Sequence, residues 1–298
     1  MSLSGGPLDS GELLGLPPAG GPSRASARGF GGRGGVLRST LVALLSTAVV
    51  FAALAWIVVN SPGWEEVRHA FFNGELFASS LPEIAGAFAV NVQLFLIAEV
   101  LILALGLVLA VGRSLGGPVF FPIRLLATVY VDVFRALPGV LVIYILGFGI
   151  PGLGIAGVPV DPFLYAIVSL TLLYSAYVSE VYRAGIESVH PSQDAAARSL
   201  GLTRVQSLRY VVVPQAVRRV IPPLLNDFIG LQKDTVLVSY IGVVEIFRQS
   251  QIDQAAAFNY TPYMATALVF LVVTIPLARF TDWLIQRDRR RSAAGGIR

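Results

Sequence analysis

The residues of this chain that could do chemistry are ionisable side chains placed inside long apolar stretches. Six residues share that setting: Glu99, Asp132, Arg135, Asp227, Lys233 and Asp234. A charge in hydrocarbon is costly, so such side chains by default pair with one another or line a path for a polar solute. We therefore predict that these six residues line a translocation pathway or its gate.

Each of these charges also has a simpler interpretation. Asp132 and Arg135 are three residues apart, so on a helix they share a face and a mutual ion pair would let both enter a bundle. Glu99 either lines the path or pairs with a residue of another helix. Lys233 and Asp234 follow a Pro-Pro pair, and irregular backbone at membrane depth is tolerated where it lines a cavity or is buried in protein.

Other reactive patterns are missing from the sequence. There is no cysteine, which excludes a zinc–cysteine site, and the two histidines have no ligand spacing. The glycine clusters at 29–35 and 147–157 lack the lysine of a phosphate-binding loop. The sequence has no serine–histidine pair and no pair of aspartates at suitable depth that would support an intramembrane enzyme. We therefore expect no catalytic residue, metal, cofactor or nucleic-acid partner, and any ATP must bind to another subunit.

The elements that must position these residues are membrane helices. The composition is 55% hydrophobic and 13% charged, against about 25% charged in soluble domains. Six apolar segments are long enough to cross a bilayer or nearly so: 39–59, 84–111, 122–148, 162–182, 214–239 and 262–283. Because backbone in lipid must satisfy its own hydrogen bonds, these segments should be helical. The predicted fold is an all-α integral membrane protein with about six transmembrane helices.

The two ends of the chain differ from this core. Residues 1–38 are rich in Gly, Pro and Ser, which predicts a disordered cytoplasmic tail. Residues 39–60 are too long for a signal peptide, whose apolar region has about 7–15 residues, and should form an additional N-terminal transmembrane helix. The core then covers 84–287, and 288–298 is a basic cytoplasmic tail.

The basic residues predict the orientation. With both termini in the cytoplasm, eighteen of the 22 basic residues fall in inside segments, and Arg68 and Arg248 fall outside. The positive-inside rule favours this arrangement. We therefore expect a multi-pass protein of the cytoplasmic (inner) membrane with both termini inside.

The cytoplasmic segment 183–219 carries the strongest local pattern. Pro191 and Ser192 can open a helix, and Gly201 can end it in the left-handed conformation. Thr203 and Gln206 have the spacing of a capping box for a second helix. Pro214 then breaks the chain near the next span. Such a helix–turn–helix either docks on a partner protein or lies on the membrane surface as an amphipathic helix.

This segment resembles the EAA loop of the permeases of ATP-binding-cassette (ABC) importers. The matching pattern is Ala196-Ala197, three residues, Gly201, nine residues, then Val211, Val213 and Pro214. Flanking blocks are similar to the polar amino acid branch of that family: 134–138, 180–183, 193–201, 213–216, 222–226 and 233–237. The resemblance covers roughly residues 85–287.

The resemblance implies a five-helix permease core, with a coupling loop at 186–214, plus one additional N-terminal helix. The function implied is movement of a polar amino acid or similar small solute by alternating access. The partners implied are two copies of an ABC ATPase subunit, a second permease chain (the same or a sister), an external solute-binding protein and the lipid bilayer. The ATPase-coupling residues implied are Gln193, Asp194, Ala195, Ala196, Ala197, Arg198, Gly201 and Pro214.

One departure from the family pattern concerns its acidic residue. The glutamate of the EAA pattern falls on Ala195, and the nearest carboxylate, Asp194, is one residue earlier. One residue is about 100° of helix, so Asp194 occupies another face. The alternative function is an ion-coupled secondary transporter, a class that often shows broken helices in two matching halves. Only one half of this sequence has a proline- and charge-interrupted span.

Overall fold

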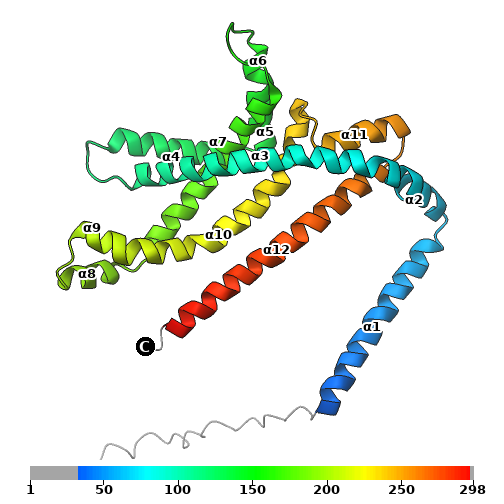
Figure 1. Cartoon of the computed structure of the whole chain (residues 1–298), viewed down its shortest axis with the longest axis horizontal. Helices are drawn as coiled ribbons and strands as arrows, with labels where there is room; N and C mark the ends of the chain where they lie inside the picture. The colour runs from blue at the N-terminus through cyan, green and yellow to red at the C-terminus, as the bar shows by residue number, and fades with distance from the viewer. Residues whose placement is uncertain (1–32, 296–298) are drawn as a thin grey trace, which may run out of the picture. The chain divides into compact units, whose positions relative to one another are not determined.

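The computed structural model describes residues 33–295, with side chains for 38–287 and 290. Every regular element in that range is a helix (Figure 1). Most of the predicted tail at 1–38 lies outside the described residues, as do 296–298. Within the described residues the chain divides into two compact units, one ending at Trp64 and the other beginning at Glu65.

The first unit contains α1 (Arg33–Val59). This helix begins inside the segment that we assigned to the tail, and its part Arg38–Val59 is long and apolar enough to span a membrane. Apolar side chains are exposed all round it, among them Leu45, Phe51 and Trp56. A helix without a polar face is typical of a membrane span.

The second unit contains the remaining helices. Its long helices are α3 (Gly74–Ser114), α4 (Phe121–Ala136), α7 (Pro162–Glu187), α10 (Val213–Asp234) and α12 (Thr261–Gly295). Its shorter helices are α2 (Trp64–Phe71), α5 (Gly139–Tyr144), α6 (Ile150–Gly152), α8 (Pro191–Ser199), α9 (Arg204–Ser207) and α11 (Ile246–Ala257). Two π-helical turns, η1 (Ile145–Gly149) and η2 (Leu208–Val212), and one 3-10 helix, η3 (Thr235–Ile241), join them. α12 continues past residue 287, into the segment that we assigned to a basic tail.

The all-helical membrane fold is confirmed, and about six spans were predicted. By length and composition, four helical segments within residues 33–295 qualify, or five if the bent pair α4 and α5–α6 is one span. That pair bends by 107°, at Leu137, which is extended with ψ of 138°. A residue before proline is driven out of the helical region, which explains the break before Pro138. α10 does not qualify because it carries Arg218, Arg219 and three further charges.

The core of the second unit is built around α7. This helix packs on α3, α10, α4 and α5, and Leu94, Leu170 and Leu231 bring three of these helices together. Small residues allow the close approaches, since Gly106 of α3 lies against Val178 of α7. Small residues at helix contacts are typical of membrane proteins, where close backbone packing replaces the hydrophobic effect. Figure 1 shows α7 and α10 both running to α8 and α9, at the end of the unit away from α6.

Candidate functional site

The first part of the site is the loop α8–α9. The left-handed turn at Gly201 is confirmed, with φ of +88°. The capping box is also confirmed, because Gln206 N donates to Thr203 Oγ1 and Thr203 N donates to Gln206 Oε1. The start of α8 at Pro191 is as predicted, but the cap is His190 and not Ser192: His190 Nδ1 accepts from Ser192 N at 3.2 Å, and Ser192 lies inside the first turn.

The predicted break at Pro214 is also wrong. Helical structure runs from Arg204 through η2 into α10, and Pro214 lies in the first turn of α10. A proline inside continuous helix removes one backbone hydrogen bond, and the π-helical turn η2 lies immediately before Pro214, where such an irregularity is expected. The loop is therefore joined to α10 by continuous helix, which connects it to the core of the second unit.

The outer surface of this loop is small and apolar. Ala195, Ala196 and Pro214 are exposed, and Leu200 and Val205 are 85% and 74% exposed. Exposed apolar groups gathered on one loop are typical of an interaction surface. The polar positions Gln193 and Arg198 are exposed beside them, whereas Ala197 is buried.

Asp194 makes a hydrogen bond within the loop, and its predicted coupling role stays a prediction. Its Oδ1 accepts a hydrogen bond of 2.6 Å from Ser207 Oγ, which ties α8 to α9. The side chain is half-buried, whereas Ala195 at the position of the family glutamate is exposed. The two residues therefore lie on different faces, as their spacing predicts, and the acid holds the loop together.

The second part of the site is an acidic cavity of about 300 Å³ between α5, α7, α10 and η3. It is lined by Gly139, Leu173, Tyr174, Tyr177, Asn226, Asp227, Gly230, Asp234 and Leu237. Its size lies at the lower end of the range for small-molecule sites, about 300–1,000 Å³. Asp227 and Asp234 are seven residues apart, so two turns of α10 bring both carboxylates to one face.

The carboxylates of this cavity have few partners. Tyr174 donates to Asp234 Oδ2 at 2.6 Å. Asp227 Oδ2 is buried and has no hydrogen-bond partner, and Glu99 of α3 lies near enough for its charge to interact with that of Asp227. No described Lys, Arg or His lies within 4.0 Å of these carboxylates. A buried acceptor without a donor favours a ligand that supplies one.

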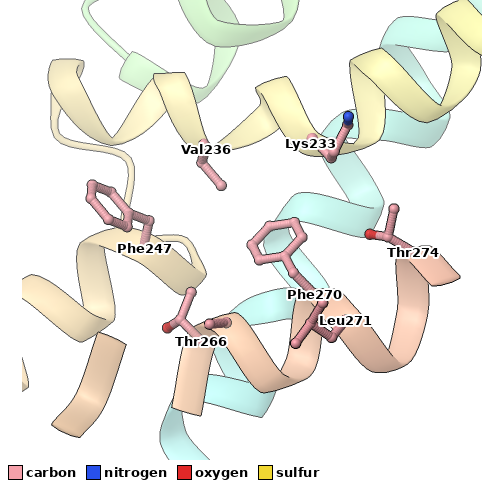
Figure 2. Close-up of a pocket in the computed structure, with 8 residues that line it drawn as sticks. Lys233, Val236, Phe247, Thr266, Phe270, Leu271 and Thr274 are labelled. Carbon is pink, nitrogen blue, oxygen red and sulfur yellow. The ribbon is translucent and has the colours of Figure 1, made fainter. Parts of the chain in front are cut away.

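Lys233 does not share this cavity with Asp234. It faces a separate groove of about 520 Å³ between α10–η3, α11 and α12. Figure 2 shows Lys233 and Val236 on one side of the groove, with Phe270, Leu271 and Thr274 on the other. Consecutive residues of a helix point about 100° apart, which explains the separation. A pathway role for Lys233 remains a prediction.

The ion pairs of the described residues also differ from our expectation. Asp132 is exposed on α4 and makes no ion pair there, while Arg135 lies 4.0 Å from Glu180 and 5.9 Å over the ring of Tyr177. Glu180 also binds Arg113 of α3 and Arg183. Asp132 and Arg135 are therefore separate, because Glu180 from the neighbouring helix attracts the arginine.

Sequence reasoning missed several residues of the site. Tyr174 and Tyr177 lie three apart on α7, but nothing in their spacing shows that they face two aspartates of α10. Asn91 and Glu245 were also missed, although they form a buried hydrogen bond of 2.9 Å. Only the packing of α3 against η3 and α11 brings that pair together.

Comparison with known proteins places this geometry among transport proteins. Residues 102–290 match the family described as "Binding-protein-dependent transport system inner membrane component". A probable glutamine ABC transporter permease of Bacillus subtilis is 36% identical over 64% of this chain and 88% of its own length. An arginine transport system permease of the same organism is 32% identical over 67% and 91%.

Solved structures show the same similarity. The crystal structure of an amino acid ABC transporter with histidines has a TM-score of 0.64 and 31% identity, over 69% of this chain and 94% of that chain. An inward-facing methionine ABC transporter has a TM-score of 0.54 at 15% identity, over 67% and 93%. The second likeness concerns the fold alone.

Proposed function

Because this chain belongs to the family of inner-membrane components of binding-protein-dependent transport systems, we propose that it passes cationic amino acids through the acidic cavity. It is the permease subunit of an ABC importer and a multi-pass membrane protein. The family assignment gives no support to the alternative of an ion-coupled secondary transporter.

The observation that carries the substrate proposal is the unpartnered Oδ2 of Asp227 in a cavity that also holds Asp234. Opposite charge within a few ångströms, together with donated hydrogen bonds, is what stabilises a buried carboxylate. An ammonium or guanidinium group provides both. Of the two relatives named above, the arginine system therefore points to the substrate class that fits this cavity better. The glutamine system points to the alternative, an uncharged polar amino acid.

The coupling proposal rests on the exposed loop α8–α9. We expect one ATPase subunit to cover Ala195, Ala196 and Leu200 of each permease, so that a complete assembly has two ATPases and two permease chains. ATP is hydrolysed in those separate subunits. The rigid passage from α9 through η2 into α10 would carry ATPase movement to Asp227 and Asp234.

The remaining parts of the proposal follow from charge and topology. An external binding protein delivers the amino acid, and both termini lie in the cytoplasm. We keep Glu99 as a pathway residue because its charge interacts with that of Asp227. Asp132, Arg135 and Lys233 keep the same proposed role, although the structure places them outside the cavity.

The test is direct binding of radiolabelled arginine, histidine, glutamine and glutamate to the purified permease–ATPase complex without binding protein. Asp227→Asn removes a charge-assisted interaction worth about 1.5–3 kcal/mol, so arginine should bind about 10–100-fold more weakly. Glu66→Gln, an exposed carboxylate of α2, is the matched control and should bind as the wild type does. Equal arginine affinity in wild type and Asp227→Asn, or preferred binding of glutamate, would refute the cationic substrate.

A further inference from the structure

A buried polar network joins α3 to the segment that covers the acidic cavity. Asn91 of α3 is 2% exposed, and its Nδ2 donates to Thr235 Oγ1 at 3.0 Å and to Glu245 Oε2 at 2.9 Å. Its Oδ1 accepts from Ile246 N at 3.1 Å. The Asn91 amide therefore both donates hydrogen bonds to, and accepts one from, residues more than 140 positions away in sequence.

Glu245 completes the network. Its side chain is fully buried and caps α11 by accepting from Phe247 N at 3.0 Å and from Arg248 N at 2.8 Å. Burial raises the pKa of the Glu245 carboxyl above its ordinary value, although the hydrogen bonds from Phe247, Asn91 and Arg248 act in the opposite direction. No described cation lies within 4.0 Å, so Asn91 is the side chain that satisfies this acid.

The positions of these contacts give the network a mechanical consequence. Thr235 begins η3 and Glu245 precedes α11, so Asn91 fastens both ends of the segment 235–246 to one point of α3. Thr235 also donates to Gln232 O, which ties the start of the segment to the last turn of α10. Within the segment, Leu237 forms a wall of the acidic cavity.

The segment also reaches the other side of the cavity. The ring of Tyr240 lies 5.9 Å from that of Tyr144, on α5, and Gly242 turns the chain with φ of +89°. The segment therefore contacts α5 and α3, and it directly follows Asp234, which accepts the hydrogen bond from Tyr174. Leu237 of this segment packs against the hydrophobic cluster that contains Tyr174.

We propose that Asn91 is a positioning residue for the acidic cavity, because it holds Thr235 and Glu245 together and thereby fixes Asp234 and Leu237 against Tyr174. This proposal rests on the proposed function, in which the cavity binds the transported amino acid. Asn91 lies outside the cavity and acts through the segment 235–246.

The test uses an exchange of the acid and the amide. Asn91→Leu removes all three hydrogen bonds of the side chain and should weaken arginine binding to the permease–ATPase complex at least tenfold. Asn91→Asp places two carboxylates face to face and should have a similar effect. The double variant Asn91→Asp/Glu245→Gln restores an amide donor opposite a carboxylate, and its arginine affinity should return to within about threefold of the wild type.

A control separates positioning from general stability. Thr281→Val removes a buried hydrogen bond to Ala278 O on α12, far along the chain from the cavity, and should lower the thermal midpoint without changing arginine affinity. If Asn91→Leu fails to assemble, the exchange variant decides the question by itself. Wild-type affinity in the single Asn91 variants, or an exchange variant as weak as they are, overturns the positioning role.

Asp234→Asn distinguishes the two proposals. If it weakens arginine binding and the Asn91 variants do not, only the positioning role fails. If Asp234→Asn and Asp227→Asn both bind arginine as the wild type does, the cavity is not the binding site and both proposals fail.

Discussion

Replacing Gly185 by alanine should force apart the two helices that enter and leave the coupling loop. Gly185 lies near the end of α7, where that helix meets the start of α10. A Cβ at this position would overlap Val220 Cγ1 and lie 3.4 Å from the backbone O of Ala216. Carbon atoms in contact are normally about 3.5–4.0 Å apart, so one of the helices must move.

The cost can be worked out from the same distances. Val220 is buried, so its methyl group cannot swing into solvent, and overpacking of this kind costs about 1–3 kcal/mol. Val220→Ala removes the clashing Cγ1 and leaves the Val220 Cβ 3.5 Å away, an ordinary contact. By itself Val220→Ala should cost about 1–2 kcal/mol, since each buried CH₂ contributes about 0.8 kcal/mol. The double variant Gly185→Ala/Val220→Ala should therefore lose less stability than the two single variants lose in sum.

The assay is the thermal unfolding midpoint of the purified complex in one detergent at fixed concentration. At about 2–4 °C for each kcal/mol, Gly185→Ala should lower the midpoint by roughly 2–12 °C. Gly86→Ala, on α3 with nothing within 4 Å of its new Cβ, is the matched control and should not lower it. An unchanged midpoint in Gly185→Ala, or no recovery in the double variant, would show that α7 and α10 do not meet as described.

Three further predictions concern the loop, the ion pairs and the topology. Gly201→Val meets no neighbour within 4 Å but strains a backbone with φ of +88°, so the chain should insert normally and lose its ATPase on copurification; retention of the ATPase with full uptake would contradict a docking role. Glu180→Gln leaves Arg113, which is 13% exposed, without its carboxylate, so it should lower the stability of the complex in the same unfolding assay by at most about 3–5 kcal/mol. An unchanged thermal midpoint would mean that the ion pair is solvated. With an impermeant thiol reagent added to intact cells, Ser61→Cys should be labelled and Ser114→Cys should not; the reverse pattern would invert the proposed orientation.

The parts of the site that could be predicted depend on neighbours in sequence. Gly201 adopts the left-handed conformation because a glycine has no Cβ to oppose it, and Thr203 reaches Gln206 because their spacing is one helical turn. The separation of Asp194 from Ala195 likewise follows from helix geometry. Two local predictions failed at helix boundaries, since His190 and not Ser192 caps α8 and helical structure continues through Pro214.

The contacts across the core could not be predicted in this way. Tyr174 and Asp234 are 60 residues apart, and Asn91 and Glu245 are 154 apart. No local pattern pairs such residues, because many polar side chains compete for each partner until the helices pack. Arg135 illustrates this competition, since Glu180 of another helix attracts it instead of Asp132 of its own.

The sequence by itself determined that this chain is a helical membrane protein with a helix–turn–helix between two of its long helices, and its motifs indicated the transporter family. Those properties depend on apolar segment length, on charge placement and on the conformations of single residues. Only the tertiary structure decided that Asp227 and Asp234 share a cavity, that Lys233 faces elsewhere and that Asn91 holds the segment beside them. The reason is physical: burial and partners are properties of the space between helices, and that space exists only after α3, α7 and α10 have packed together.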